Sequence, residues 1–229
     1  MPLLFYFFNF FCMDDGYSLL SLFTQTDYQL TPYSYGTYSV NAYCSIAAST
    51  DADRTGTVLW PATNCLLEFL FREPRYSIPK GSTIIELGCG IALPSLFLAK
   101  YNSTITTATD SESEVLDIVN RNAEANHVNI RALLLSWGLK EAQEFVQEHG
   151  TFDFVIGADV LYDPCFFDHL LHTAVTLLTD SPSAKGIIAY KRRSNATHSM
   201  LLESIHRVIP HCELIECGGD FFVLHFGRS

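Results

Sequence analysis

The chain has 229 residues, 48% of them hydrophobic, which is enough for one α/β domain with a full core. Its formal net charge of −11 argues against a nucleic-acid-binding surface, which needs clustered Lys and Arg, and suits a cationic partner such as a lysine-rich protein segment. The seven cysteines form no CxxC pair and no ligand set surrounds the histidines. We therefore expect reduced thiols, a protein of the cytoplasm or of the cytoplasm and nucleus, and no metal site.

The first residues, MPLLFYFFNFFC, are strongly apolar but too short to span a bilayer. They lack the positive start and the small-residue cleavage site of a secretory signal, so we expect no stable membrane association. Met13-Asp14-Asp15 follows at once and resembles an ordinary polar start. The sequence therefore leaves open whether residues 1–12 are part of the mature protein.

The next segments predict an N-terminal extension that carries strands. Asp14–Gln29 is expected to be a short helix or irregular. Tyr33–Ile46 alternates aromatic or apolar residues with small polar ones, which is typical of a strand pair with one buried face. Ser49–Gly56 is a polar loop. We therefore divide the chain into an extension, residues 1–54, and one domain, residues 55–229.

From Pro61 onward the chain alternates between helical and strand patterns, which predicts a parallel sheet covered on both faces. Helices are expected over Ala62–Arg72, from Leu93, and over Ser111–Asn126 (with Ser111 as N-cap), Leu139–His149, Phe166–Leu178 and Ala196–Val208. Strands are expected over Thr83–Leu87, Ile105–Thr109, Val128–Ser136, Phe152–Ala158, Gly186–Tyr190, Glu213–Glu216 and Phe221–Phe226. The last two strands should form an antiparallel pair at the sheet edge. The expected fold is an α/β, Rossmann-like, seven-stranded sheet.

A glycine turn, Gly88-Cys89-Gly90, separates the first of these strands from a helix. An apolar strand that ends in glycines and opens a helix presents backbone N–H groups to a ligand. The dinucleotide fingerprint requires a third glycine where this chain has Leu93. Glu86 adds a carboxylate that could meet a cationic ligand. These two features favour S-adenosylmethionine (SAM) over a dinucleotide.

Asp110 ends the next strand, about twenty residues after the turn, where a carboxylate accepts hydrogen bonds from ribose hydroxyls. The alternative is that Asp110 only caps a helix. Trp137, at the end of the third strand, could lie against an adenine face, although a Trp beside a strand is more often part of the core. Trp60 has the same two interpretations.

Asp159 and Tyr162 follow the fourth strand, at the edge where open sheets bind ligands. Their spacing would let both face one cavity if the turn were helical. Methyl transfer from a sulfonium is an in-line displacement, so the enzyme must align an unprotonated nucleophile. A carboxylate could hold a lysine amine for this step. The alternative is that Asp159 caps the following segment and Tyr162 belongs to the core.

Together these residues resemble the family-16 methyltransferases, seven-β-strand enzymes that mostly methylate lysines of non-histone proteins. The resemblance runs from about Thr55 to the end of the chain. It rests on Trp60-Pro61, Glu86-Leu-Gly-Cys-Gly, Asp110, Leu135-Ser-Trp137-Gly138 and Gly157-Ala-Asp159-Val-Leu-Tyr162. The Asp-x-x-Tyr and Leu-x-Trp-Gly elements are its most specific parts. The resemblance implies a class I SAM-dependent fold.

The resemblance also implies roles for particular residues. The SAM pocket would be lined by Trp60, Gly88, Cys89, Gly90, Asp110, Trp137 and Ala158, with Glu86 supporting the turn. Asp159 and Tyr162 would handle the substrate. The chain departs from many members at Ala92, where they have glycine, and at Pro61, where they have an acid. Trp60-Pro61 with Leu93-Pro94 is similar to a branch for which arginine is also a proposed acceptor.

The expected function is SAM-dependent methylation of a lysine in a non-histone protein substrate, by a monomer. The substrate could be a chaperone, a translation protein or another protein, and the number of methyl groups added stays open. The alternatives are arginine methylation, a small-molecule methyltransferase, or a non-catalytic SAM-binding module that binds a partner. A nucleic-acid amino-methyltransferase usually has Asn/Asp-Pro-Pro-Tyr after the fourth strand, and this chain lacks those prolines.

Overall fold

The structure is a computed structural model that describes residues 28–45 and 56–227. The predictions for residues 1–12, for most of Asp14–Gln29 and for most of the loop Ser49–Gly56 lie outside these ranges. Tyr28 and Gln29 are described, and they belong to a strand rather than to the helical or irregular segment that we expected.

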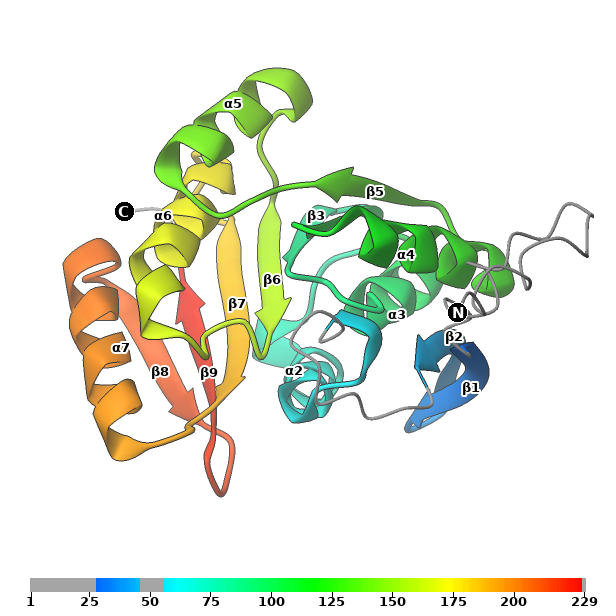
Figure 1. Cartoon of the computed structure of the whole chain (residues 1–229), viewed down its shortest axis with the longest axis horizontal. Helices are drawn as coiled ribbons and strands as arrows, with labels where there is room; N and C mark the ends of the chain where they lie inside the picture. Colours follow the sequence, from blue (N-terminus) through cyan, green and yellow to red (C-terminus); the bar gives the residue numbers. More distant parts are fainter. Residues whose placement is uncertain (1–27, 46–55, 228–229) are drawn as a thin grey trace, which may run out of the picture.

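A seven-stranded sheet forms the centre of the molecule (Figure 1). Its strands are β3 (Thr83–Leu87), β4 (Ile105–Asp110), β5 (Ile130–Leu134), β6 (Phe154–Ala158), β7 (Lys185–Lys191), β8 (Cys212–Glu216) and β9 (Phe221–Phe226). Their order is β5-β4-β3-β6-β7-β9-β8. Neighbouring strands from β5 to β7 pair in parallel, and β9 is antiparallel to both β7 and β8. The predicted sheet and its antiparallel edge pair are confirmed.

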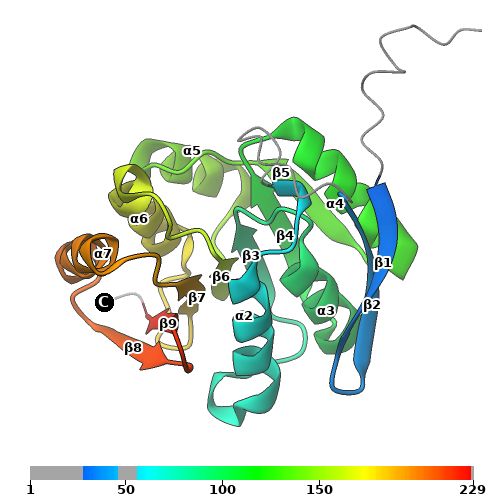
Figure 2. The same cartoon turned by 60° about the horizontal axis from the view of Figure 1, so that its bottom comes forward.

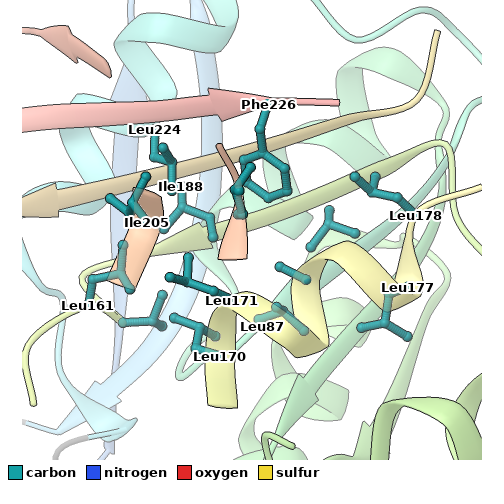
Figure 3. Packing of buried hydrophobic residues seen from close by; sticks show 14 of the residues in the cluster. Leu87, Leu161, Leu170, Leu171, Leu177, Leu178, Ile188, Ile205, Leu224 and Phe226 are labelled. Carbon is teal, nitrogen blue, oxygen red and sulfur yellow. The ribbon is translucent and has the colours of Figure 1, made fainter. Parts of the chain in front are cut away.

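Helices cover both faces of the sheet, as is usual for a sheet built mainly of parallel strands (Figure 2). They are α2 (Pro61–Arg72), α3 (Leu93–Asn102), α4 (Ser113–Asn126), α5 (Leu139–His149), α6 (Phe167–Leu177) and α7 (Asn195–Val208), with the short 3₁₀ helices η2 (Pro74–Tyr76) and η3 (Pro164–Phe166). One core cluster joins α5, α6 and α7 to the sheet, and Figure 3 shows Leu170, Leu171 and Leu177 of α6 packed against strand residues such as Ile188. Two further clusters join α2, α3 and α4 to the opposite face.

The boundaries of the elements differ from the sequence predictions mainly where the chain leaves a strand. Ser111 is not the N-cap of α4, because this helix begins at Ser113 after Glu112. The Asp110 carboxylate accepts hydrogen bonds from the backbone N–H groups of Ser111 and Glu112 instead. The third strand is also shorter than Val128–Ser136, since only Ile130–Leu134 pairs with β4.

A β-hairpin precedes the sheet domain. Its strands are β1 (Tyr28–Tyr35) and β2 (Tyr38–Ser45), so the predicted strand pair is confirmed, although it starts earlier than Tyr33. Val40 and Ala42 of β2 are buried in the cluster that contains α3 and α4. The hairpin therefore adds a layer outside these two helices (Figure 2).

Two asparagines of α4, one turn apart, hold the outer edge of β2. Asn126 accepts a hydrogen bond from the N–H of Asn41 at 2.9 Å and donates to its carbonyl at 2.6 Å. Asn122 accepts from the N–H of Tyr43 at 2.6 Å and donates to the carbonyl of Ile91, just after the glycine turn, at 3.0 Å. These side chains satisfy strand groups that would otherwise lack a partner, and they link the hairpin to the turn.

We predict that Asn122→Ala destabilises the fold. Asn122 is fully buried, and its loss leaves the N–H of Tyr43 and the carbonyl of Ile91 without their partner. The expected loss in the free energy of unfolding is about 1–3 kcal/mol, measured by urea denaturation. Asn120→Ala, at an exposed position of the same helix, is the matched control. Equal stability of the two variants would contradict this role for Asn122.

Candidate active site

A cavity of about 800 Å³ lies at the carboxyl ends of the parallel strands. The chain turns to opposite sides of the sheet after β3 and β6, which are neighbours, and ligands of such sheets bind at this point. All ten residues that the sequence analysis singled out line the cavity: Trp60, Glu86, Gly88, Cys89, Gly90, Asp110, Trp137, Ala158, Asp159 and Tyr162. The fold thus brings residues from four strand ends and the start of α2 into one site.

The glycine turn after β3 has a left-handed backbone, with φ of 57° at Gly88 and 51° at Gly90. A Cβ on Gly88 would lie 2.7 Å from a methyl of Val160 and 3.0 Å from the ring of Trp137. A Cβ on Gly90 would lie 2.9 Å from the carbonyl oxygen of Gly56. Both positions therefore need glycine for space as well as for conformation.

Ala92 also has a left-handed conformation, with φ of 57°, immediately before α3. An L-residue with a Cβ is strained there, whereas glycine is not. The resemblance implies glycine at this position in many family members, and the backbone conformation observed at Ala92 also favours glycine. Asn122 holds the neighbouring carbonyl of Ile91 and so supports the turn from outside.

Glu86, in β3, is fully buried beneath the turn. One of its carboxylate oxygens accepts hydrogen bonds from both the N–H and the hydroxyl of Ser95, in the first turn of α3. Burial raises the pKa of Glu86 to about 7, and the hydrogen bonds from Ser95 oppose this rise. The carboxyl group is therefore close to its titration point at neutral pH, and it would favour a cationic ligand in the cavity.

Asp110, at the end of β4, links the glycine turn to α4. One carboxylate oxygen accepts from the N–H of Gly90 at 3.1 Å and the other from the N–H of Ser111 at 2.9 Å. Burial is the largest influence on the Asp110 carboxyl and raises its pKa. The carboxylate lines the cavity and binds the two residues that precede α4, so it does not cap that helix as the alternative interpretation of the sequence proposed.

Aromatic side chains surround the opening of the cavity. Trp137 is half-buried and lies edge-on to Phe166, with 6.3 Å between the ring centroids. Tyr162 is 52% exposed and Phe166 is 47% exposed. Burial, followed by the charges of Asp163 and Asp110, raises the pKa of the Tyr162 phenol. Tyr162 is therefore a protonated side chain at the surface and not a core residue. Phe166 was not predicted as a site residue, because no motif includes it.

The carboxylate of Asp159 has hydrogen-bond partners that the sequence did not indicate. The turn after β6 is not helical, because Asp159 has φ of 60° and the following residues form no helix before Pro164. This conformation directs the carboxylate towards α2, where one oxygen accepts from the N–H of Ala62 at 3.2 Å. Asp159 thus caps a helix earlier in the chain, not the segment that follows it. Its side chain is 2% exposed.

Arg193, which follows β7, was not predicted as a site residue. Its guanidinium donates to the second oxygen of Asp159 at 3.1 Å and lies 5.4 Å from the ring centroid of Trp60. One feature could have indicated Arg193 as a site residue. It follows β7, which ends at the same edge of the sheet as β3 and β6. Its partner could not be identified from the sequence.

Two further properties concern the described residues only. They contain no group of three His, Cys, Asp or Glu side chains that could hold a metal ion. Over the same ranges, no helix combines the length and the apolar character needed to cross a bilayer.

Comparison with known proteins agrees with this architecture. The chain matches the family model described as lysine methyltransferase over residues 42–207. It is 27% identical over 141 residues to the histone-arginine methyltransferase METTL23 of Mus musculus, covering 61% of this chain and 54% of that protein. It is 28% identical over 161 residues to the protein-lysine N-methyltransferase EFM3 of Chaetomium thermophilum, covering 67% of this chain and 47% of that protein. The chain thus spans about half the length of these relatives.

The solved structure of SMU.776, which was crystallised in complex with S-adenosylhomocysteine (SAH), has a TM-score of 0.58 at 13% identity. The match covers 82% of this chain and 53% of that chain, and it concerns the fold alone. The family model covers more than half of the chain, so the prediction of the family is confirmed. This chain belongs to the lysine methyltransferase family and has the class I fold of SAM-dependent methyltransferases.

Proposed function

We propose that this chain transfers a methyl group from SAM to a lysine side chain of a non-histone protein. The observation that carries the proposal is the cavity at the strand ends, where the predicted cofactor and substrate residues occur together. Its volume of about 800 Å³ lies within the range usual for cofactor sites. Exposed aromatic rings at the opening, Tyr162 and Phe166, suit contact with a macromolecular substrate.

In this proposal SAM lies across the ends of β3, β4 and β5. Its methionine part faces the turn Gly88–Gly90, where Glu86 supplies negative charge beneath a cationic ligand. Its ribose faces Asp110 and its adenine faces Trp137. Trp60, Cys89 and Ala158 complete the lining of the pocket. When bound, SAM supplies an electrophilic methyl group on a sulfonium.

The acceptor side of the cavity is formed by Asp159 and Tyr162. An amine attacks the methyl carbon in line with the departing sulfur, so the nitrogen must be unprotonated and aligned. Each oxygen of the Asp159 carboxylate has two lone pairs, and Ala62 and Arg193 use one on each. A lone pair on each oxygen is therefore left to orient the incoming amine. The buried carboxylate would be reached through the cavity and not from the surface.

Arginine is the second candidate acceptor, because METTL23 relatives are named histone-arginine methyltransferases. The family model and the EFM3 relatives favour lysine. A small-molecule methyltransferase would use the same cofactor pocket with a different acceptor. We also propose that the protein is a monomer of the cytoplasm or nucleus with no nucleic-acid substrate. The net charge of −11 supports only the last of these, because binding to phosphates needs clustered Lys and Arg.

The test is transfer of a labelled methyl group from SAM to a hypomethylated cell extract, with protein and small-molecule fractions counted separately. The proposal predicts label in one or a few protein bands, and mass spectrometry of those bands should place it on lysine. Label on arginine would move the acceptor to the second candidate. Label only in small molecules, or none from protein that binds SAM, would contradict a protein methyltransferase.

We predict that the affinity for SAM falls as the pH is lowered through about 7. Burial raises the pKa of Glu86 to about 7, so below this pH the carboxyl group is protonated and has lost the charge that favours a cation. Cationic SAM favours the ionised form, and its dissociation constant should therefore rise by up to about tenfold per pH unit below 7. Calorimetry of the wild type and of Glu86→Gln at matched pH isolates this contribution, since the protonation of SAM itself affects both. Parallel pH profiles would contradict it.

We also predict that Asp159→Asn abolishes methyl transfer and leaves SAM binding nearly intact. The substitution removes the negative charge at the acceptor side but no group from the proposed SAM contacts. Transfer is measured with labelled SAM and binding by calorimetry. Asp117→Asn, at an exposed position of α4, is the control for a change of charge alone. A variant that loses binding and transfer equally would refute the substrate role of Asp159.

A further inference from the structure

Arg193 is the only Lys or Arg among the described residues that line the cavity, and the other charged residues there are acids. Its neighbour Arg192 pairs with Asp220 at 2.7 Å and does not line the cavity. Ser194 caps α7 by accepting from the N–H of Thr197 at 3.1 Å. The backbone around Arg193 is thus fixed on both sides, and its side chain is 39% exposed.

The guanidinium of Arg193 holds two side chains from separate elements. It donates to Asp159, at the end of β6, and lies over the ring of Trp60, at the start of α2. A planar guanidinium can donate to a carboxylate and lie against an indole at the same time, whereas an ammonium is a compact point charge. The contact therefore requires arginine and not only a positive charge.

The Asp159 carboxylate depends on this contact because it is almost completely buried. A buried carboxylate that loses one of its partners is left with an uncompensated charge and tends to leave its position. Without Arg193, the N–H of Ala62 would still donate to Asp159 at 3.2 Å, but this group is neutral and cannot balance the charge. The charge of Asp159 also contributes to the raised pKa of the Cys65 thiol in α2, but a thiol cannot supply a positive charge. Arg193 thus supplies the positive charge that faces Asp159.

We propose that Arg193 is a positioning residue for methyl transfer. It holds the Asp159 carboxylate, on the proposed acceptor side, and the Trp60 indole, in the lining of the proposed SAM pocket, in one fixed arrangement. It acts through Asp159 and takes no part in bond making. This inference rests on the proposed function, because it assigns Arg193 to the acceptor side of that reaction.

The test is Arg193→Ala, assayed with labelled SAM and the hypomethylated extract. The rate of transfer should fall about 100-fold, as small displacements of aligning groups do. The calorimetric affinity for SAM should fall much less than the rate, because Trp60 is one of several residues that line the proposed SAM pocket. Guanidinium chloride at low, non-denaturing concentration should restore part of the rate, and methylammonium chloride should not. Arg193→Lys should remain impaired. Arg192→Ala, which alters the adjacent arginine outside the cavity, is the matched control.

A second measurement does not depend on activity. The chain has two tryptophans, so the indole N–H signal of Trp60 can be assigned by NMR with Trp137→Phe. This signal should shift in Arg193→Ala and return towards its wild-type position when guanidinium is added. If the wild type transfers no methyl group, the proposed function fails, and this measurement still decides whether Arg193 holds Trp60.

Three results would overturn the inference. One is wild-type activity in Arg193→Ala. Another is that guanidinium inhibits this variant by competing with the acceptor protein. The space beside Trp60 and Asp159 would then be the binding site for the cation of the acceptor side chain. The third is an unchanged Trp60 signal in a folded Arg193→Ala protein.

Discussion

Three carboxylates at the ends of neighbouring parallel strands accept hydrogen bonds from backbone N–H groups in the first turn of a helix or just before it. Glu86 of β3 holds Ser95 in α3, Asp110 of β4 holds Ser111 and Glu112 before α4, and Asp159 after β6 holds Ala62 in α2. The donors to Glu86 and Asp159 lie in the first turn of a helix, where N–H groups have no partner within the helix and the helix dipole favours negative charge. The three contacts therefore fix the strand ends relative to the helices that surround the cavity.

This arrangement determines the electrostatic character of the site. The carboxylates are satisfied on one side by the scaffold, so they present charge to the cavity without needing to rearrange when a ligand arrives. A preorganised set of charges and dipoles is what stabilises developing charge most effectively. Glu86 and Asp110 lie on the side that we assign to the cofactor, and Asp159 lies on the side that we assign to the acceptor. Arg193 supplies the compensating positive charge at Asp159 only.

The position of the cavity could be predicted from the sequence because it depends on local patterns. The glycines of the turn and the acid that ends β4 follow apolar strands, and parallel strands bring their carboxyl ends to one edge. The contacts of Asp159 could not be predicted in this way. Its partners Ala62 and Arg193 are 97 and 34 residues away, and only the left-handed conformation of Asp159 directs its carboxylate towards α2.

The place where the hairpin packs could not be predicted from the sequence either. The alternating pattern of Tyr33–Ile46 predicted strands, but nothing in it indicated which helix would cover them. The attachment depends on Asn122 and Asn126, which look like ordinary polar residues of an amphipathic helix and are in fact buried. Because these asparagines bind the backbone of β2, the side-chain pattern of the strand does not indicate the contacts.

The most direct test of the central claim is a crystal structure of the chain with SAH. We expect SAH in the cavity, with its adenine at Trp137, its ribose hydroxyls at Asp110 and its amino acid part at the Gly88–Gly90 turn. Arg193 should still be paired to Asp159. SAH bound elsewhere, or an adenine placed at the Asp159 side of the cavity, would contradict the assignment of the cofactor and acceptor sides.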